Sequence, residues 1–124
     1  MLTVQDPTDQ SCTVKIRSHF VFRNHNCIVT ELLSYNLYQL MKMNSFAPMS
    51  NTVLKQFAQQ IIIALVHLRR CNIMHCDLKP ENILLQNPDA CLIKVADFGS
   101  SCFVGEWSSS YIQSRFYRAP EVCA

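Results

Sequence analysis

A run of eight residues, 75–82, gathers a carboxylate, a lysine and a primary amide at fixed spacing, and an Asp-Phe-Gly tripeptide begins fifteen positions later at Asp97. These side chains suit phosphoryl transfer, because a protein contributes to that reaction mainly by positioning groups and neutralising charge. Asp77 is placed to orient an attacking hydroxyl, and Lys79 is placed to reach the transferred phosphate. Asn82 and Asp97 would hold Mg²⁺ through oxygen atoms.

The region after this tripeptide is polar, rich in serine, and ends in Ala119-Pro120-Glu121. Each short motif occurs by chance in unrelated chains, but their order and spacing together are typical of the catalytic core of a protein kinase. On this interpretation, residues 75–82 form the catalytic loop and residues 100–118 form the activation loop.

Tyr111 is the candidate regulatory residue of the activation loop. A phosphate there would add nearly two negative charges and three acceptor oxygens. Arg115 and Arg118 follow at four and seven residues, where they would bind the phosphate and order the loop. The alternative is that Tyr111 is a half-buried aromatic residue and that both arginines face solvent; spacing alone does not separate the two. Phe103 and Trp107 are expected to anchor the loop rather than bind a ligand.

Hydrophobic periodicity predicts one long helix. Apolar residues recur at three- and four-residue spacing across Asn51–Arg70, as in a helix buried along one side, and Ser50 is placed to cap it. Residues 13–17 and 26–30 have the composition of two short strands, which we expect to form a hairpin.

A second hairpin is predicted next to the catalytic loop, where Ile83–Leu85 and residues 91–95 flank a polar turn. This hairpin holds Asn82 at its entry and Asp97 just beyond its exit. Such mounting favours catalysis, because small displacements of positioned groups lower the rate strongly. The long helix, Phe98 and this hairpin are expected to expose apolar faces that further chain would cover.

The length permits one hydrophobic core but not a complete kinase domain. The chain has 124 residues and 49% hydrophobic content, whereas a two-lobed kinase domain needs roughly twice this length. No glycine-rich phosphate loop or strand lysine with its partner glutamate is found, and the only glycines are Gly99 and Gly105. The expected fold is α+β and protein-kinase-like, truncated at both ends. Residues 1–33 would form the end of the N-lobe sheet and the hinge, and residues 34–124 the first part of the helical C-lobe through the activation segment.

Charge and hydropathy argue against two classes of partner. The net charge is +2 and the basic residues are scattered, unlike the footprint of a protein that binds nucleic acid or a membrane surface. The longest apolar run, 61–66, is far too short to span a bilayer, and the first seven residues lack the pattern of a secretory signal. Protein substrates are the expected partners, and the oligomeric state is left open.

The seven cysteines form an odd set without a Cys-x-x-Cys pair, which favours reduced thiols and a location in the cytoplasm or nucleus. Zinc is a competing explanation for Cys71, His75 and Cys76, but no second pair lies at ligand spacing. A nucleophilic Cys76 is a further, disfavoured alternative. Most protein kinases have arginine at this position, where it pairs with a phosphorylated loop, so here the pairing would move to Arg115 and Arg118.

Five segments carry a resemblance to a particular kinase family. They are Phe22-Arg23-Asn24-His25 and residues 31–38, 75–82, 97–102 and 111–121. On these segments the chain resembles the dual-specificity tyrosine-regulated kinases (DYRK), from roughly residue 11 to its last residue. The resemblance implies transfer of the ATP γ-phosphate to serine or threonine of protein substrates, with Mg²⁺ as cofactor and with autophosphorylation of Tyr111.

The resemblance also implies an adenine site. Glu31 and Leu33 would meet adenine through backbone groups, with Leu84 beneath the ring. Thr30 stands beside this pocket, where the family usually has a bulky phenylalanine.

Three functions stay open on the sequence alone. The joint presence of the four polar site residues favours an active protein kinase, and the absent glycine-rich loop favours a truncated, non-catalytic kinase-like module that binds substrates or partners. A small-molecule kinase on a related fold is the third. Ala119-Pro120-Glu121 and the tyrosine in the activation segment argue against it.

Overall fold

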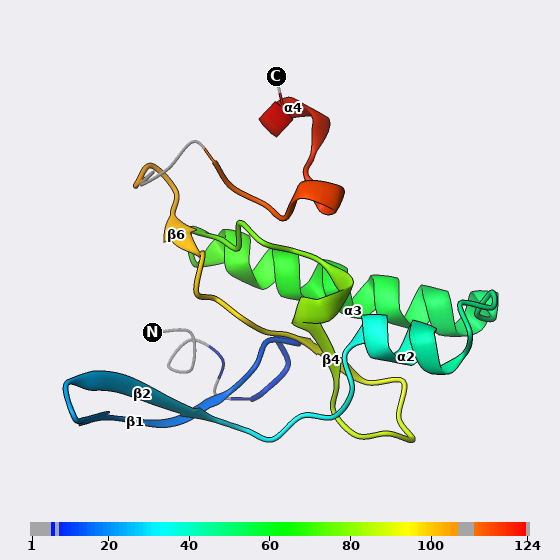
Figure 1. Ribbon diagram of the computed structural model, residues 1–124, viewed down its shortest axis with the longest axis horizontal. Helices are drawn as coiled ribbons and strands as arrows, with labels where there is room; N and C mark the ends of the chain where they lie inside the picture. Colours follow the sequence, from blue (N-terminus) through cyan, green and yellow to red (C-terminus); the bar gives the residue numbers. More distant parts are fainter. Residues whose placement is uncertain (1–5, 7, 107–110, 124) are drawn as a thin grey trace.

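A helix of 20 residues, α3 (Asn51–Arg70), runs through the middle of the molecule, and other elements lie along it or near its ends (Figure 1). The computed structural model describes residues 6, 8–106 and 111–123. The predicted helix is confirmed together with its cap, because Ser50 Oγ accepts the backbone N–H of Val53 at 3.4 Å. The residues buried on its inner face are Phe57, Ala64 and Leu68.

The predicted second hairpin is also confirmed, as the antiparallel pair β4 (Ile83–Leu85) and β5 (Ile93–Val95). It packs on α3, and the core cluster consists of Phe57, Ile83, Leu85 and Ile93. The amide of Gln60 fastens the hairpin to the helix, since its Nε2 donates to the Cys91 carbonyl at 2.8 Å and its Oε1 accepts the Ile93 N–H at 2.9 Å. The hairpin is therefore mounted rigidly on the long helix.

The expectation of exposed apolar faces is right for α3 and wrong for strands β4 and β5, although Leu92, just before β5, is 51% exposed. Ile62 and Ile63 of the helix are 59% and 45% exposed, whereas all three residues of β5 are buried. Phe98 is half-buried, because its ring packs on that of His75 with 4.9 Å between centroids. Ile83, Leu85 and Ile93 of the two strands are hidden because α3 and α2 cover them.

The first hairpin forms, but the predicted bounds of its first strand are wrong. The strands are β1 (Ile16–Phe22) and β2 (His25–Thr30), and a two-residue turn with left-handed φ values of 48° at Arg23 and 61° at Asn24 joins them. Residues 12–14 lie instead along β5, where the Val14 N–H donates to the Val95 carbonyl at 2.8 Å. A tertiary pairing thus takes residues that local alternation assigned to the hairpin. In Figure 1 the β1–β2 hairpin projects away from the helices.

A short helix, α2 (Leu37–Met43), was not predicted from the sequence. It begins at a capping box, in which Asn36 Oδ1 accepts the Gln39 N–H at 2.8 Å and Gln39 Oε1 accepts the Asn36 N–H at 3.0 Å. Leu37 and Leu40 pack against the core cluster. The helix therefore extends the layer that supports β4.

Replacing Asn36 with alanine is expected to lower the free energy of unfolding by about 1 kcal/mol, because the first turn of α2 loses its cap. Urea denaturation of the full-length protein, followed by far-UV circular dichroism, measures this loss. Asn51→Ala is the matched control, since Asn51 is exposed in the first turn of α3, and it is expected to change stability by less than about 0.5 kcal/mol. Equal losses in the two variants would contradict the capping role.

Five short elements complete the described chain. Strands β3 (Ile73–Met74) and β6 (Cys102–Phe103) pair, so the chain before the catalytic loop lies against the chain after Asp97. The remaining three are the 3₁₀ turns η1 (Pro80–Asn82) and η2 (Arg115–Tyr117) and the terminal turn α4 (Pro120–Cys123). Trp107 lies outside the described residues, so its predicted anchoring role is not addressed. Among those residues, none of the helices has the length and apolar content that crossing a membrane requires.

Candidate active site

The carboxylate of Asp77 is the centre of a dense polar network. Its Oδ2 pairs with the Lys79 Nζ at 2.6 Å and accepts from the Asn82 Nδ2 at 3.2 Å. Its Oδ1 accepts the hydroxyl proton of Ser114 at 2.6 Å, and the Lys79 Nζ donates to the same hydroxyl at 3.0 Å. Three predicted site residues therefore meet, and the activation segment joins them through Ser114.

The network favours the ionised form of Asp77. Partial burial by itself raises the pKa of this carboxyl, but hydrogen bonds from Lys79 and Ser114 and the positive charge of Lys79 outweigh it and hold the pKa below its ordinary value. The same pairing raises the pKa of Lys79. Asp77 is thus a carboxylate that is already oriented and already in contact with a hydroxyl group.

His75 links the catalytic loop to the strand that leads to Asp97. The side chain is buried, and Nε2 donates to the carbonyl of Ala96 at 3.0 Å, since a carbonyl can only accept. Its Nδ1 then accepts the backbone N–H of Asp77 at 3.3 Å. The two ring nitrogens of one side chain therefore fix the loop and the end of β5 relative to each other.

Asn82 and Asp97 lie at the two ends of the β4–β5 hairpin, as predicted. The backbone N–H of Ala96 donates to the Asn82 carbonyl at 2.8 Å, which brings residue 97 next to Asn82. The Asn82 Nδ2 also donates to the Asp77 carbonyl at 2.9 Å, so its Oδ1 is directed elsewhere. Asp97 is exposed, and its Oδ1 accepts the Gly99 N–H at 3.3 Å. One amide oxygen and one carboxylate fit Mg²⁺, which completes its shell with phosphate oxygens and water.

Left-handed backbone occurs at three non-glycine residues of this region. The φ values are 63° at Cys76, 60° at Asp97 and 66° at Gln113. Such conformations raise the energy of a non-glycine residue and persist where surrounding contacts hold them, often at functional sites. Here the Gln113 N–H donates to the Cys76 carbonyl at 2.9 Å, which ties the activation segment to the catalytic loop.

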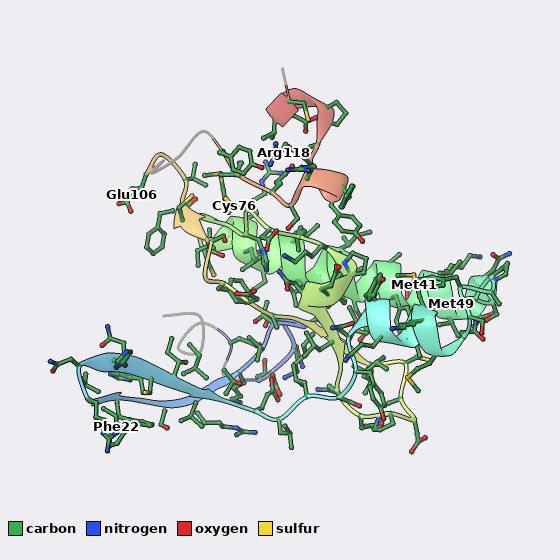
Figure 2. All side chains as sticks on the ribbon, in the orientation of Figure 1. Phe22, Met41, Met49, Cys76, Glu106 and Arg118 are labelled. Atoms are coloured by element: carbon green, nitrogen blue, oxygen red, sulfur yellow. The ribbon has the colours of Figure 1, made fainter. Side chains whose placement is uncertain are left out.

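Tyr111 and Arg118 are in direct contact. The Arg118 guanidinium lies 4.1 Å from the centroid of the Tyr111 ring, and it also donates to the carbonyls of Ile112 at 3.0 Å and Gln113 at 2.9 Å. A hydrogen bond from Arg118 and its charge, with a smaller contribution from Arg115, lower the pKa of the Tyr111 phenol. Figure 2 shows Cys76 and Arg118 in the upper part of the view, between the two ends of the long axis.

These contacts bear on the alternative reading of the tyrosine. Tyr111 is 69% exposed, so it is not a half-buried aromatic residue, and Arg118 does not simply face solvent. Arg115 is exposed on η2. The predicted grouping of basic side chains around Tyr111 is therefore present, with Arg118 as the main partner.

The predicted adenine residues lie along one segment. Thr30 is the exposed last residue of β2, and residues 34–36 of the segment that follows lie beside β4. The Ser34 N–H donates to the Leu85 carbonyl at 2.8 Å, and Asn36 forms an antiparallel bridge with Leu84. Leu84 is half-buried, and its bridge with Asn36 places it beside the segment that carries Glu31 and Leu33.

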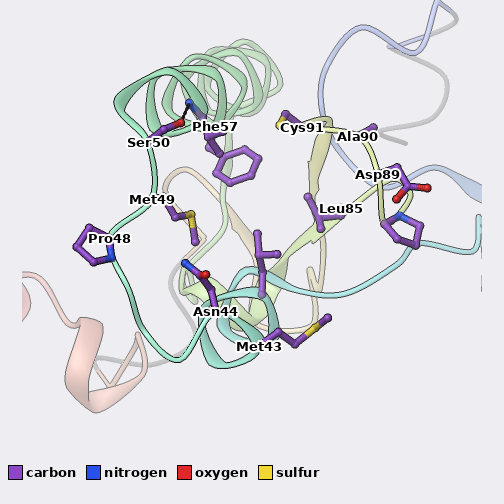
Figure 3. Close-up of a pocket in the computed structure, with 13 residues that line it drawn as sticks. Met43, Asn44, Pro48, Met49, Ser50, Phe57, Leu85, Asp89, Ala90 and Cys91 are labelled. Atoms are coloured by element: carbon purple, nitrogen blue, oxygen red, sulfur yellow. Dashed lines mark hydrogen bonds between the residues drawn. The ribbon is translucent and has the colours of Figure 1, made fainter.

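Two cavities differ in their relation to these residues. One, of about 460 Å³, contains Asp77, Ser114, Tyr111 and Arg115 in its lining, so it joins the catalytic and regulatory groups. The other, of about 510 Å³, lies between α2, α3 and the β4–β5 loop, with Phe57 among its apolar lining residues (Figure 3). Its described lining contains none of the predicted site residues.

Two further charged or polar residues of the region were missed from the sequence. Ser114 was noted only as part of the family pattern, and its contact with Asp77 spans 37 positions, which no local pattern reveals. Lys94 is fully buried in β5 with its Nζ between two carboxylates. The available signal was a lysine inside an otherwise apolar strand. Among the described residues, no three or more His, Cys, Asp or Glu side chains are grouped so that they could hold a metal ion, and Cys71, His75 and Cys76 are therefore not brought together as ligands.

The geometry defines a class of protein: a carboxylate held by a lysine and an asparagine, beside a hairpin that ends in an Asp-Phe-Gly turn, is the catalytic centre of a protein kinase. Residues 4–124 match the protein kinase domain family, and because this match covers nearly the whole chain, the chain belongs to that family. The predicted α+β, kinase-like fold is confirmed.

Curated relatives show which protein kinases the chain is similar to. The chain is 53% identical over 117 residues to the DYRK-family kinase pom1 of Schizosaccharomyces pombe, covering 94% of this chain and 11% of the relative. It is 50% identical over 117 residues to the probable serine/threonine-protein kinase yakA of Dictyostelium discoideum, covering 94% of this chain and 8% of the relative. It is 48% identical over 121 residues to the probable serine/threonine-protein kinase dyrk2 of the same organism, covering 98% of this chain and 13% of the relative. The chain thus spans only a small part of these relatives, and the predicted DYRK resemblance is confirmed.

Proposed function

We propose that the protein containing this chain transfers the γ-phosphate of ATP to serine or threonine hydroxyls of protein substrates. The observation that carries the proposal is the contact between the Ser114 hydroxyl and the Asp77 carboxylate at 2.6 Å, with the Lys79 ammonium 3.0 Å from the same hydroxyl. A substrate hydroxyl would make the same two contacts. The names of the relatives, which are serine/threonine or DYRK-family kinases, support the same activity.

The mechanism follows from the roles that these side chains can take. Asp77 accepts a hydrogen bond from the attacking hydroxyl and orients it toward the γ-phosphate. It receives the hydroxyl proton as the new P–O bond forms and the bond from the γ-phosphorus to the bridging oxygen breaks, which releases ADP. Lys79 stays cationic because Asp77 raises its pKa, so it stabilises the charge on the transferred group. Asn82 holds the Asp77 carboxylate and backbone carbonyl in place through its Nδ2.

Mg²⁺ is the cofactor that the site fits. The Asn82 Oδ1 and the Asp97 carboxylate would hold it, and when bound it neutralises charge on the nucleotide phosphates. Adenine would meet the backbone of Glu31 and Leu33, with Leu84 beneath the ring and Thr30 at the edge of the pocket. These assignments rest on the family resemblance and on the position of residues 34–36, directly after Leu33, beside β4.

A phosphotransfer assay tests the proposed function. The full-length protein is incubated with ATP labelled at the γ-phosphate and with a generic protein substrate such as myelin basic protein or casein. We expect label on serine and threonine, and we expect chelation of Mg²⁺ by EDTA to abolish it. A protein that binds partners but transfers no label with Mg²⁺ present would favour the non-catalytic module.

We further propose that Tyr111 is an autophosphorylation site that regulates the kinase. Arg118 is already in contact with its ring, and Arg115 contributes to the same positive environment, so a phosphate on Tyr111 would find two cations near it. Arg118 also fastens residues 112 and 113, and Gln113 is joined to the catalytic loop at Cys76. A phosphate on Tyr111 would therefore act on the loop that carries Asp77 through the contacts of Arg118 and Gln113.

Replacing Arg118 with glutamine is expected to lower kcat of the Tyr111-phosphorylated protein on the order of tenfold, the usual range for coupling between two sites. Mass spectrometry confirms the phosphotyrosine, and steady-state kinetics measures the loss. Arg115→Gln is the matched control with a smaller expected effect, because Arg115 is exposed. A larger loss for Arg115→Gln than for Arg118→Gln would reverse this assignment.

For location, we propose the cytoplasm and/or the nucleus. The seven cysteines, all within the described residues, form no disulfide with one another, which suits a reducing compartment. Imaging of the tagged full-length protein in the secretory pathway would contradict this.

A further inference from the structure

Lys94 is a charged side chain in the most buried strand of the molecule. It lies in β5 between Ile93 and Val95, and its side chain is 2% exposed. Its Nζ lies 2.6 Å from the Asp9 Oδ1 and 2.7 Å from the Glu31 Oε1. Burial by itself lowers the pKa of this amine, but the hydrogen bonds and charges of the two carboxylates outweigh it, so the pKa is raised above its ordinary value. The fold thus keeps a lysine cation inside, which is tolerated only when it is paired.

Glu31 is the better shielded of the two partners, with a side chain 13% exposed against 36% for Asp9. The Glu31 Oε1 also accepts the backbone N–H of Lys15 at 2.8 Å, and its own N–H donates to the Lys15 carbonyl at 3.0 Å. Both the side chain and the backbone of Glu31 are therefore held. Three residues later, the Ser34 N–H is bound to Leu85 of β4.

Lys94 therefore fixes one end of the segment that is proposed to receive adenine, and β4 fixes the other. The same strand that carries Lys94 runs on to Asp97, which is proposed to hold Mg²⁺. We infer that Lys94 is a positioning residue for nucleotide binding, which acts through the Glu31 side chain to set the backbone groups of residues 31–33. This inference rests on the proposed kinase function, and it assigns Lys94 no contact with the reacting atoms.

The consequence is a split between binding and chemistry. Without the Lys94 cation, Glu31 would turn toward solvent, and backbone groups aimed at adenine would lose their alignment. We expect Lys94→Met to raise the Kd of a non-hydrolysable ATP analogue, such as AMP-PNP with Mg²⁺, about tenfold, the order expected for one misaligned hydrogen bond. We expect kcat at saturating ATP to stay within about twofold, because Asp77 and Lys79 are untouched.

The experiment measures analogue binding by isothermal titration calorimetry and phosphotransfer by steady-state kinetics in the full-length protein. Lys55→Met, which removes an exposed lysine of α3, is the matched control and should leave both unchanged. Because removing one partner of a buried ion pair also destabilises the fold, Glu31→Gln provides a second variant that keeps an acceptor for the Lys15 N–H. The Kd of Glu31→Gln for the ATP analogue should also rise. The double variant, Lys94→Met with Glu31→Gln, should bind the analogue no more weakly than Lys94→Met alone, since the two substitutions remove the same contact.

The outcomes separate this inference from the proposed function. An active wild-type protein whose Kd is unchanged in both single variants, or whose two changes add, overturns the role of Lys94 alone. A wild-type protein that binds the analogue and shows the predicted shifts, but transfers no phosphate, overturns the kinase proposal and supports the role of Lys94 in binding. A wild-type protein that binds no nucleotide overturns both.

Discussion

Replacing Asp77 with asparagine is expected to lower kcat about 10³-fold while the KM for ATP stays within about twofold. Asparagine keeps the shape of the side chain and can still accept one hydrogen bond, but it cannot receive the hydroxyl proton and offers Lys79 no charge. Loss of a positioned general base typically reduces the rate 10²- to 10⁴-fold. The carboxylate contacts the hydroxyl of Ser114 and the Lys79 ammonium. The substitution therefore changes the part of the site that binds the phosphate-accepting hydroxyl and leaves the proposed ATP contacts in place.

Steady-state kinetics of the full-length protein with labelled ATP measures this effect. Asp89→Asn is the matched control, because Asp89 is an exposed aspartate in the β4–β5 turn, outside the catalytic residues. It should leave kcat unchanged. A loss below about tenfold for Asp77→Asn would mean that the contact with Ser114 does not represent the contact with a substrate.

The sequence predicted those parts of the fold that local patterns determine. The helix Asn51–Arg70 was predicted with its bounds because a long apolar stripe begins at a capping serine and a single period accounts for all of it. The β4–β5 hairpin was predicted because apolar runs flank a polar turn. The helix α2 was missed although Asn36 and Gln39 supplied a capping box, since seven residues are too few to establish a period.

The rest depends on contacts between distant residues. Nothing near residue 13 indicates that it pairs with Val95 rather than continuing the first hairpin. A lysine inside a strand is ordinarily read as facing solvent, and Lys94 is buried only because Asp9 and Glu31, distant in sequence, supply its counter-charges.

The candidate site shows the same division. Asp77, Lys79 and Asn82 could be assigned roles from spacing because they lie within one loop, and Asp97 because a hairpin returns the chain to that loop. A contact between Tyr111 and Arg118 was one of two interpretations of their separation by seven residues, and the structure decides between them. Ser114 could not be placed against Asp77 in this way, because the activation segment reaches the catalytic loop through the turn at Gln113 and its hydrogen bond to Cys76.

Replacing Lys79 with methionine is expected to lower kcat about 10²- to 10³-fold, the range for removing one group that stabilises charge in a transition state. Methionine has a similar length and keeps the apolar stem, so the loss would report the ammonium itself, which bridges Asp77 and the Ser114 hydroxyl. Lys79→Arg should recover only part of the rate, because a planar guanidinium cannot reproduce two contacts made by one compact cation. Single-turnover measurements with saturating Mg²⁺ and ATP isolate the chemical step, and Lys55→Met serves as the control for loss of an exposed lysine. An unchanged chemical step in Lys79→Met would show that this ammonium serves only to hold the activation segment against the catalytic loop.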